Sequence, residues 1–159
     1  MTFPSHIING ALCYIIHNEQ VLLLQRSRPP HVGLWSAPGG KMEHTESPQE
    51  TVVREIFEET GLTVHDPVLR ALQTSVDKFY PVHWMLYIFV ATAFNGELKT
   101  TAEGVLQWHN VPSVAHLARP YPDTCYWQHI ISHQPGIWQG KFVYDTPEKL
   151  LEETVYSGG

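Results

Sequence analysis

The sequence predicts a compact α+β or α/β sandwich, built from many strands and few helices. A chain of 159 residues is long enough to bury one hydrophobic core without cross-links. Its composition is that of a globular protein, because 43% of the residues are apolar and 16% are charged. Apolar, strand-like runs alternate with turn-forming residues along most of the chain. We therefore expect one domain over residues 1–159.

The first predicted element is a β-hairpin. Residues 9–26, NGALCYIIHNEQVLLLQR, contain two runs rich in Leu, Val and Ile on either side of the turn HNEQ. Residues 27–40 hold too many Pro and Gly residues for regular structure. We expect a loop there that leads to a short strand near Trp35.

A helix with clear signals at both ends is predicted next. Ser47 can cap its start, Pro48 suits the first helical position, and Glu50 completes a capping box of the S-x-x-E type. Gly61 can adopt the left-handed conformation that ends a helix. The helix should run from Pro48 to about Thr60.

This helix has an apolar face beside an acidic one. At about 100° per residue, Ile56 and Phe57 fall on the side that we expect in the core, and the adjacent side carries three glutamates, Glu55, Glu58 and Glu59. An isolated acidic pair on a helix is usually a solvated face. Here a glycine-containing loop and a further carboxylate, Glu46, precede the helix. Such a cluster of oxygen ligands suits Mg²⁺ or Mn²⁺, and Mg²⁺ commonly shares its coordination shell with substrate phosphates.

The remainder of the chain reads mainly as strands. Apolar runs predict strands over residues 67–77, 82–94 and 104–111. Residues 124–134 have helical spacing of apolar side chains, and residues 140–145 and 150–156 look like closing strands.

Charge and composition exclude several classes of protein. The net charge of −6 argues against a nucleic-acid polymer as partner, since such proteins normally carry a basic surface. The longest apolar stretch, WMLYIFVATAF, is too short to span a bilayer, and the N-terminus lacks the pattern of a signal peptide. Cys13 and Cys125 lie in apolar contexts and should be buried free thiols. We expect a cytoplasmic protein, monomeric or homodimeric, that binds no membrane.

The segment GGKMEHTESPQETVVREIFEETGL resembles the signature of the Nudix hydrolases. The family pattern is Gly, five residues, Glu, seven residues, then Arg-Glu-apolar-x-Glu-Glu-x-Gly-apolar. It is met at every position, by Gly40, Glu46, Arg54, Glu55, Ile56, Glu58, Glu59, Gly61 and Leu62. The resemblance implies an α/β/α sandwich with a mixed β-sheet, and hydrolysis of a nucleoside diphosphate linked to another group.

The resemblance also implies roles for the residues of the motif. Glu58 and Glu59 would bind Mg²⁺, for which Mn²⁺ can substitute, together with the carbonyl of Gly39. Glu55 would be either a further metal ligand or the base that activates water.

The same resemblance implies roles for two further glutamates, Glu46 and Glu103. Arg54 would orient the glutamates by pairing with Glu46, a pair that would also stabilise the helix. Glu103 is similar to an additional metal-binding glutamate of several triphosphatases in the family, with Glu97 as its competitor.

The flanking sequence resembles the oxidised-purine nucleoside triphosphatases of the family. Arg26 would reach the phosphates, or is a solvated strand-end arginine. In YPDTCYW, Tyr121 would stack on a purine, and Asp123 would contact the edge of the base. This sequence departs from that branch at Thr124, where a second Asp is typical, and at Ser36, where a base-contacting Asn is typical.

Three functions are consistent with these residues. The first is a Mg²⁺-dependent pyrophosphohydrolase of 8-oxo-dGTP or related purine nucleoside triphosphates. The second is a pyrophosphatase of ADP-ribose or another nucleoside diphosphate derivative. The third, from a different class, is a non-catalytic nucleotide-binding module, which would normally have lost some of the helix glutamates.

Overall fold

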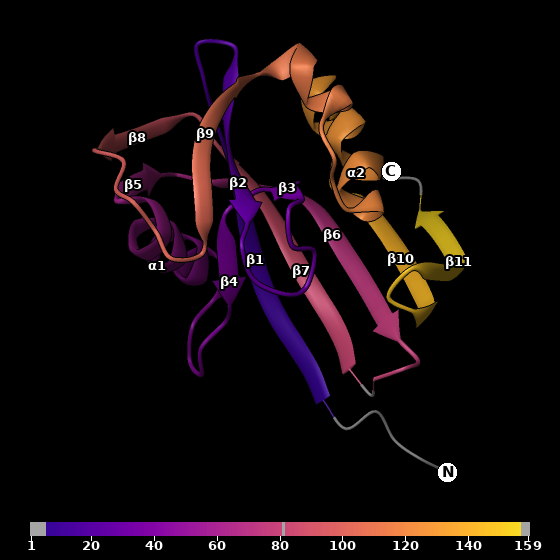
Figure 1. Ribbon diagram of the computed structural model, residues 1–159. Coiled ribbons are helices and arrows are strands. Elements are labelled where there is room, and N and C mark those ends of the chain that lie inside the picture. Colours follow the sequence, from indigo (N-terminus) through magenta and orange to yellow (C-terminus); the bar gives the residue numbers. More distant parts are fainter. Residues whose placement is uncertain (1–5, 81, 157–159) are drawn as a thin grey trace.

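The computed structural model describes residues 6–80 and 82–156 of the chain. A large mixed sheet crosses the molecule, with strands in the order β11-β10-β6-β7-β1-β2-β3; β4 also pairs with β1, and β9 with β2 (Figure 1). In order along the chain, the first strands of this sheet are β1 (His6–His17), β2 (Gln20–Arg26), β3 (Trp35–Ser36), β4 (Gly39–Lys41) and β6 (Val68–Asp77). The later strands of this sheet are β7 (Val82–Ala91), β9 (Gly104–Asn110), β10 (Trp138–Thr146) and β11 (Lys149–Tyr156). A second sheet of two strands pairs β5 (Leu62–His65) with β8 (Ala93–Gly96).

The large sheet is mixed because two of its pairings are parallel. β1 runs parallel to β7 from His6 opposite Val82 to Ile15 opposite Ala91, and β10 runs parallel to β6. The remaining pairings are antiparallel, including the predicted hairpin of β1 and β2 and the closing hairpin of β10 and β11.

Helices cover both faces of this sheet. The helix α1 (Pro48–Thr60) packs on β1, β4 and β5, and α2 (Tyr121–Ile131) packs on β6 and β10 (Figure 1). A short 3₁₀ helix, η1 (Val111–His116), connects β9 to the segment before α2. Since successive side chains of a strand point to opposite faces, Tyr14 joins the core under α2, and Cys13 and Ile15 join the core under α1. The predicted α/β/α sandwich with a mixed sheet is confirmed.

The predicted limits of α1 are those of the structure. Ser47 Oγ accepts a hydrogen bond from the Glu50 amide, and the Glu50 side chain accepts one from the Ser47 amide, so that the capping box is complete. Gly61 ends the helix with φ of 83°. A Cβ at this position would lie 2.4 Å from the Glu97 carbonyl oxygen, so glycine is required for space as well as for conformation.

Several details of the prediction are wrong. Phe57 is 55% exposed rather than buried, because it lies at the edge of the apolar arc; the ammonium of Lys99 sits 5.5 Å from its ring centroid. Cys125 is only partly buried, although Cys13 is buried and both thiols are free. The run predicted as one strand over residues 82–94 is divided into β7 and β8, and the helix predicted over residues 124–134 begins at Tyr121 and ends at Ile131. Among the described residues, no helix is long and apolar enough to cross a membrane.

Candidate active site

The glutamates of α1 face the strand β4, which precedes the helix in sequence. β4 is held beside β1 by antiparallel pairing, with Gly40 opposite Ala11, and α1 packs on both strands. A Cβ on Gly40 would lie 2.5 Å from the carboxyl carbon of Glu55. The absence of a side chain at position 40 therefore allows the Glu55 carboxylate to lie directly against the backbone of β4. We call the three helix carboxylates Glu55, Glu58 and Glu59 the carboxylate ridge.

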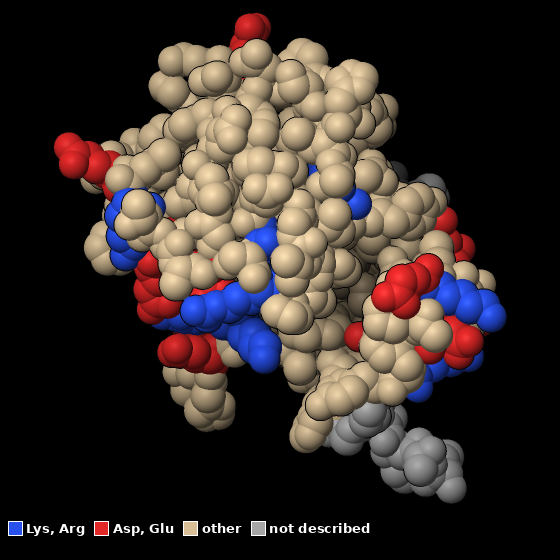
Figure 2. Space-filling view, in the orientation of Figure 1, with Lys and Arg blue, Asp and Glu red and all other residues tan. Residues whose placement is uncertain are grey.

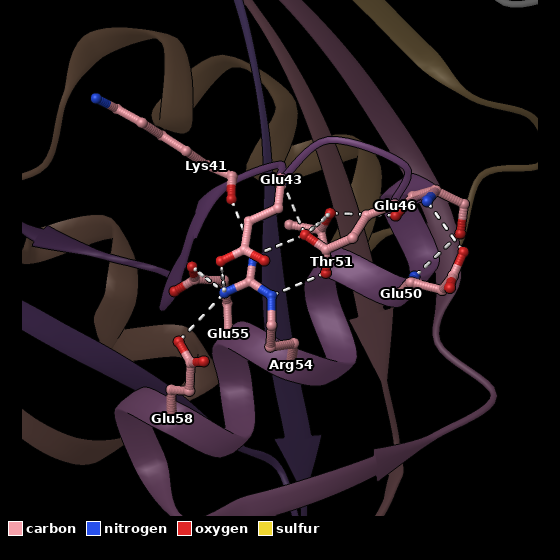
Figure 3. A network of polar contacts seen from close by, with 9 residues as sticks. Lys41, Glu43, Glu46, Glu50, Thr51, Arg54, Glu55 and Glu58 are labelled. Carbon is pink, nitrogen blue, oxygen red and sulfur yellow. Dashed lines mark hydrogen bonds and ion pairs between the residues drawn. The ribbon is translucent and has the colours of Figure 1, made fainter.

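Arg54 joins the carboxylates of α1 to the loop before it (Figure 3). Its Nε and Nη2 donate to the two carboxylate oxygens of Glu46, at 2.8 and 2.9 Å. Its Nη1 donates to Glu55 at 2.8 Å and to Glu58 at 3.2 Å. Nη2 also donates to the carbonyl oxygen of Lys41, at 3.1 Å. The predicted pairing of Arg54 with Glu46 is present, and it is bidentate, the geometry that suits a guanidinium best.

The contact with Arg54 keeps Glu46 ionised. Hydrogen bonding from the Arg54 guanidinium lowers the pKa of Glu46 to about 2, and the amide of Glu43 also donates to Glu46, at 2.8 Å. The carboxylates of Glu46 and Glu55 in turn raise the pKa of Arg54. Glu46 thus acts as a permanent anion that fixes the guanidinium between the loop and the helix.

Glu59 is a partly buried carboxylate of the ridge. Its Oε2 accepts a hydrogen bond from the amide of Gly39, at 3.0 Å. The pKa of Glu59 is raised to about 7, mainly by burial and also by the charges of Glu55 and Glu103, whereas the Gly39 amide and Arg26 act to lower it. Burial likewise raises the pKa of Glu55. Burial therefore disfavours the ionised forms of Glu59 and Glu55.

The chemistry of the ridge fits a hard divalent cation. Its side-chain donors are carboxylate oxygens, the ligands that Mg²⁺ and Mn²⁺ prefer. The raised pKa of Glu59 indicates a place where added positive charge would be favourable. Within residues 6–80 and 82–156, no three acidic, His or Cys side chains already surround one point as a metal cage would. Glu55 and Glu58 are instead held by Arg54.

Two predicted residues outside α1, Glu103 and Arg26, act on the pKa of Glu59. Glu103, which precedes β9, is close enough for its charge to act on Glu59, and it forms an ion pair of 3.3 Å with Arg28. Arg26, at the end of β2, donates from Nε to the carbonyl of Pro30, at 2.7 Å. The charge of Arg26 acts to lower the pKa of both Glu59 on α1 and Asp123 on α2.

The residues predicted to contact a base lie on β3 and α2. Ser36 is buried in β3, and Asp123 is buried in α2 with only 5% of its surface exposed. Burial raises the pKa of Asp123 to about 6, although Arg119 acts to lower it. Tyr121 is 49% exposed, and its hydroxyl donates to Glu153 of β11, at 2.8 Å.

Charged residues gather unevenly on the surface. Figure 2 shows acidic and basic side chains side by side over α1 and β4, whereas the surface over β9, η1 and α2 is largely uncharged. Charged side chains also gather over β10 and β11 in the same view, and the less polar area lies beside the ionic area over α1 and β4.

Sequence reasoning missed three polar neighbours in this area: the Lys41 carbonyl that binds Arg54, the Glu43 amide that binds Glu46, and Arg119 beside Asp123. The first two are backbone groups, which leave no sequence signal. Arg119 could have been noticed only because Lys and Arg are scarce, ten in 159 residues, and because it stands two positions before Tyr121.

The comparisons with known proteins agree on the family. Residues 7–126 match the NUDIX domain. The Nudix hydrolase YvcI of Bacillus subtilis, itself described as uncharacterized, is 36% identical over 152 residues, which cover 93% of this chain and 91% of the relative. The crystal structure of a mutator MutT protein from Bacillus halodurans superposes with a TM-score of 0.82 at 38% identity, covering 93% of this chain and 97% of the other.

Relatives named for a substrate match over shorter stretches. An 8-oxo-dGTP diphosphatase of Proteus vulgaris is 37% identical over 94 residues, 58% of this chain and 80% of the relative. An ADP-ribose pyrophosphatase of Methanocaldococcus jannaschii is 37% identical over 96 residues, 60% of this chain and 55% of the relative. Nudix proteins act on small nucleotides and generally use divalent metal ions. The family match, the shared fold and the complete motif on α1 together place this chain among the Nudix hydrolases, enzymes that act on phosphoanhydride bonds.

Proposed function

We propose that this protein is a Mg²⁺-dependent nucleoside triphosphate pyrophosphohydrolase, which converts 8-oxo-dGTP or a related purine (deoxy)nucleoside triphosphate to the monophosphate and pyrophosphate. The observation that carries the proposal is the carboxylate ridge, held against β4 by Arg54 and by the Gly39 amide. Because burial raises the pKa of Glu59 to about 7, the ridge favours a bound cation, and a cation there would attract a polyphosphate. The identity of the metal as Mg²⁺, rather than another divalent ion, is part of the proposal.

Each residue of the motif has a task in this proposal. Glu58 and Glu59, with the carbonyl of Gly39, would hold the cations, and Glu103 would add a ligand from the loop before β9. Divalent cations, when bound, supply charge neutralisation for phosphate oxygens and Lewis acidity toward an attacking water. Arg54 would not touch the substrate; it would keep Glu55 and Glu58 in position by the hydrogen bonds described above.

Glu55 is proposed either as a metal ligand or as the group that takes the proton of the attacking water. Its side chain is only 16% exposed and burial raises its pKa above the ordinary value of a glutamate, which favours its action as a proton acceptor. In that role the water oxygen forms a bond to one phosphorus, the P–O–P bridge breaks, and the proton moves to Glu55. No covalent bond to the protein is needed.

The nucleoside end would lie toward α2. Arg26 is proposed to contact the phosphates, since its charge acts on both Glu59 and Asp123. Ser36, Tyr121 and Asp123 would line the site of the base. The likeness to the Proteus vulgaris 8-oxo-dGTP diphosphatase supports this choice of substrate.

Hydrolysis of ADP-ribose or another nucleoside diphosphate derivative is the second candidate. It is favoured by the likeness to the Methanocaldococcus jannaschii ADP-ribose pyrophosphatase, which is of the same identity over a similar length. A non-catalytic module is set aside, because the chain belongs to a family of hydrolases and has all the glutamates of the motif. Residence in the cytoplasm, and a monomeric or homodimeric state, stay predictions.

A panel of nucleotides tests the proposed function. We expect 8-oxo-dGTP and dGTP to yield pyrophosphate and a monophosphate with Mg²⁺, with a higher kcat/KM for 8-oxo-dGTP. Activity confined to ADP-ribose would favour the second candidate, and a common rate for all compounds would contradict selectivity for oxidised purines.

Replacement of one ridge carboxylate tests the site. Glu58→Gln should fold normally, because the Glu58 side chain is 56% exposed, and should lose at least about a thousandfold in kcat through the loss of a metal-binding charge. Glu152→Gln on the exposed strand β11 is the control and should retain full activity. Wild-type turnover of Glu58→Gln with Mg²⁺ would refute the assignment.

A further inference from the structure

An arginine lies among aromatic rings beside the predicted base site. The guanidinium carbon of Arg119 is 5.7 Å from the ring centroid of Tyr14 on β1 and 5.3 Å from that of Trp127 on α2. Its Nη2 donates to the Tyr14 hydroxyl, at 2.5 Å, and the Tyr14 hydroxyl in turn donates to that of Tyr126, at 3.3 Å. Asp123 lies close enough for its charge to act on Arg119.

Most donors of this guanidinium have no partner in the described part of the chain. A guanidinium has five N–H donors and no acceptor. The Nε of Arg119 is buried without a hydrogen bond, and no described carboxylate lies within 4.0 Å of the side chain. The bond to Tyr14 is the only one that it donates among the described residues. Arg119 as a whole is partly buried, but its Nε is buried, and an unsatisfied Nε is unusual because buried donors are nearly always satisfied.

The segment that carries Arg119 is fixed on both sides. The amide of Trp35 donates to the carbonyl of Ala118, at 2.9 Å, so the residue before Arg119 is joined to β3 next to Ser36. Pro120 follows as the N-cap of α2, and Asp123 lies in the first turn of this helix. Arg119, Ser36 and Asp123 therefore belong to one rigid arrangement rather than to a loose loop.

We propose that Arg119 is a specificity-determining residue of the base site, and that together with Asp123 it selects 6-oxopurines over 6-aminopurines. This inference rests on the proposed function, because it assigns the base of the nucleotide at that same site. The guanidinium donates to the oxygen at position 6, and the carboxylate accepts from the N–H at position 1.

The donor and acceptor pattern of the two purine classes explains the selection. A 6-oxopurine such as guanine presents acceptors at O6 and N7, to which arginine is the common partner. Adenine presents an amino donor at position 6 and an acceptor at position 1, so its donor would meet the guanidinium and its acceptor would meet the carboxylate. Sites built around hydrogen bonds reject such an analogue strongly, because their own polar groups are left unpaired.

Steady-state kinetics with dGTP, dITP and dATP test this inference. Wild-type enzyme should prefer dGTP and dITP over dATP, and dITP tests the 6-oxo group alone because it lacks the 2-amino group. Arg119→Lys keeps a positive charge near Tyr14 and Trp127 and so should fold, but it loses the planar fork of the guanidinium. We expect it to lower kcat/KM for dGTP and dITP about 10–100-fold and that for dATP less than about threefold.

A matched control separates base recognition from general damage. Arg70→Lys changes the same kind of side chain on β6, where Arg70 donates to the carbonyl of Gln134, and should leave the ratio of dGTP to dATP turnover unchanged. Circular dichroism and the thermal midpoint of Arg119→Lys establish that it is folded. An unchanged preference in folded Arg119→Lys, or a wild-type enzyme that does not discriminate between dGTP and dATP, would overturn the inference.

Binding measurements keep this inference distinct from the proposed hydrolysis. Calorimetric titration with dGMP and dAMP, without metal, should show tighter binding of dGMP to wild-type protein and loss of that difference in Arg119→Lys. If no triphosphate is hydrolysed but dGMP is still preferred, the proposed function fails and the base assignment holds. Equal binding of the two nucleotides, or tighter binding of dAMP, would refute the base assignment.

Discussion

Arg54 is the residue on which the positions of several carboxylates depend. It contacts Glu46 in the loop and both Glu55 and Glu58 on α1, and it also lies 3.7 Å from Glu43. A guanidinium can serve all of them because its five donors point in fixed and different directions. Lysine has a single ammonium and cannot make the bidentate contact with Glu46 together with the contacts to the helix.

We expect Arg54→Lys to lower the thermal midpoint by about 5 °C, because charge-assisted hydrogen bonds are lost while the carboxylates stay. Its kcat should fall more than tenfold, since Glu55 and Glu58 are no longer held. Thermal unfolding and turnover of the variant are compared with those of Arg70→Lys. A variant that is destabilised but turns over at the wild-type rate would show that Arg54 stabilises the fold without positioning the glutamates.

The raised pKa of the Asp123 carboxyl makes the stability of the folded protein depend on pH. Burial raises the pKa of its carboxyl from 3.8 to about 6 in the folded protein. Between pH 4 and 6 the folded state therefore binds more protons than the unfolded state, and the stability that Asp123 contributes falls as the pH rises through this range. Arg119, Tyr126 and Arg26 act in the opposite direction and favour its charged form.

Asp123→Asn should remove this pH dependence. The unfolding free energy of the wild type minus that of the variant is expected to be larger at pH 4.5 than at pH 8, by roughly 1–3 kcal/mol. Urea unfolding at the two pH values measures it, and groups that titrate in both proteins cancel. The assignment fails if the difference is the same at both pH values.

At the scale of elements, the two helices differ in how well the sequence predicts them. The limits of α1 follow from local signals, since Ser47, Glu50 and Gly61 each act within one turn of the helix. At the start of α2, Pro120 makes no side-chain capping bond, and the apolar spacing predicts a start at residue 124, three residues after the observed one. The division of residues 82–96 into β7 and β8 was also missed, because one apolar run continues through both strands.

The N-terminal cap of α1 contributes measurably to the free energy of unfolding. Ser47→Ala removes the acceptor for the Glu50 amide and should lower the free energy of unfolding by about 1 kcal/mol. Chemical denaturation measures this, with Ser113→Ala on the exposed side of η1 as the control. An effect no larger than that of the control would mean that packing alone sets the start of the helix.

At the scale of the whole molecule, the candidate site divides into a local part and a non-local part. The carboxylate ridge and Arg54 lie within one helix, so a single pattern in the sequence identifies them. The environment of Asp123 is assembled from β1, β3, the segment before α2 and α2 itself. No spacing in the sequence reports that Tyr14 and Arg119 meet, because chain folding alone brings them together. For the same reason, the position of Phe57 around the helix axis could not show that no other described element covers its side of α1.

The parallel pairing of β1 with β7 joins two stretches that are far apart in the sequence. Hairpins form within microseconds, whereas long-range pairing is slow because a large loop must close first. β4 pairs with β1, and α1 packs on both strands. The glutamates of α1 therefore reach their final places only once β1 has paired with β7. A refolding chain should thus regain secondary structure early and hydrolytic competence last, and the return of activity marks closure of the sheet.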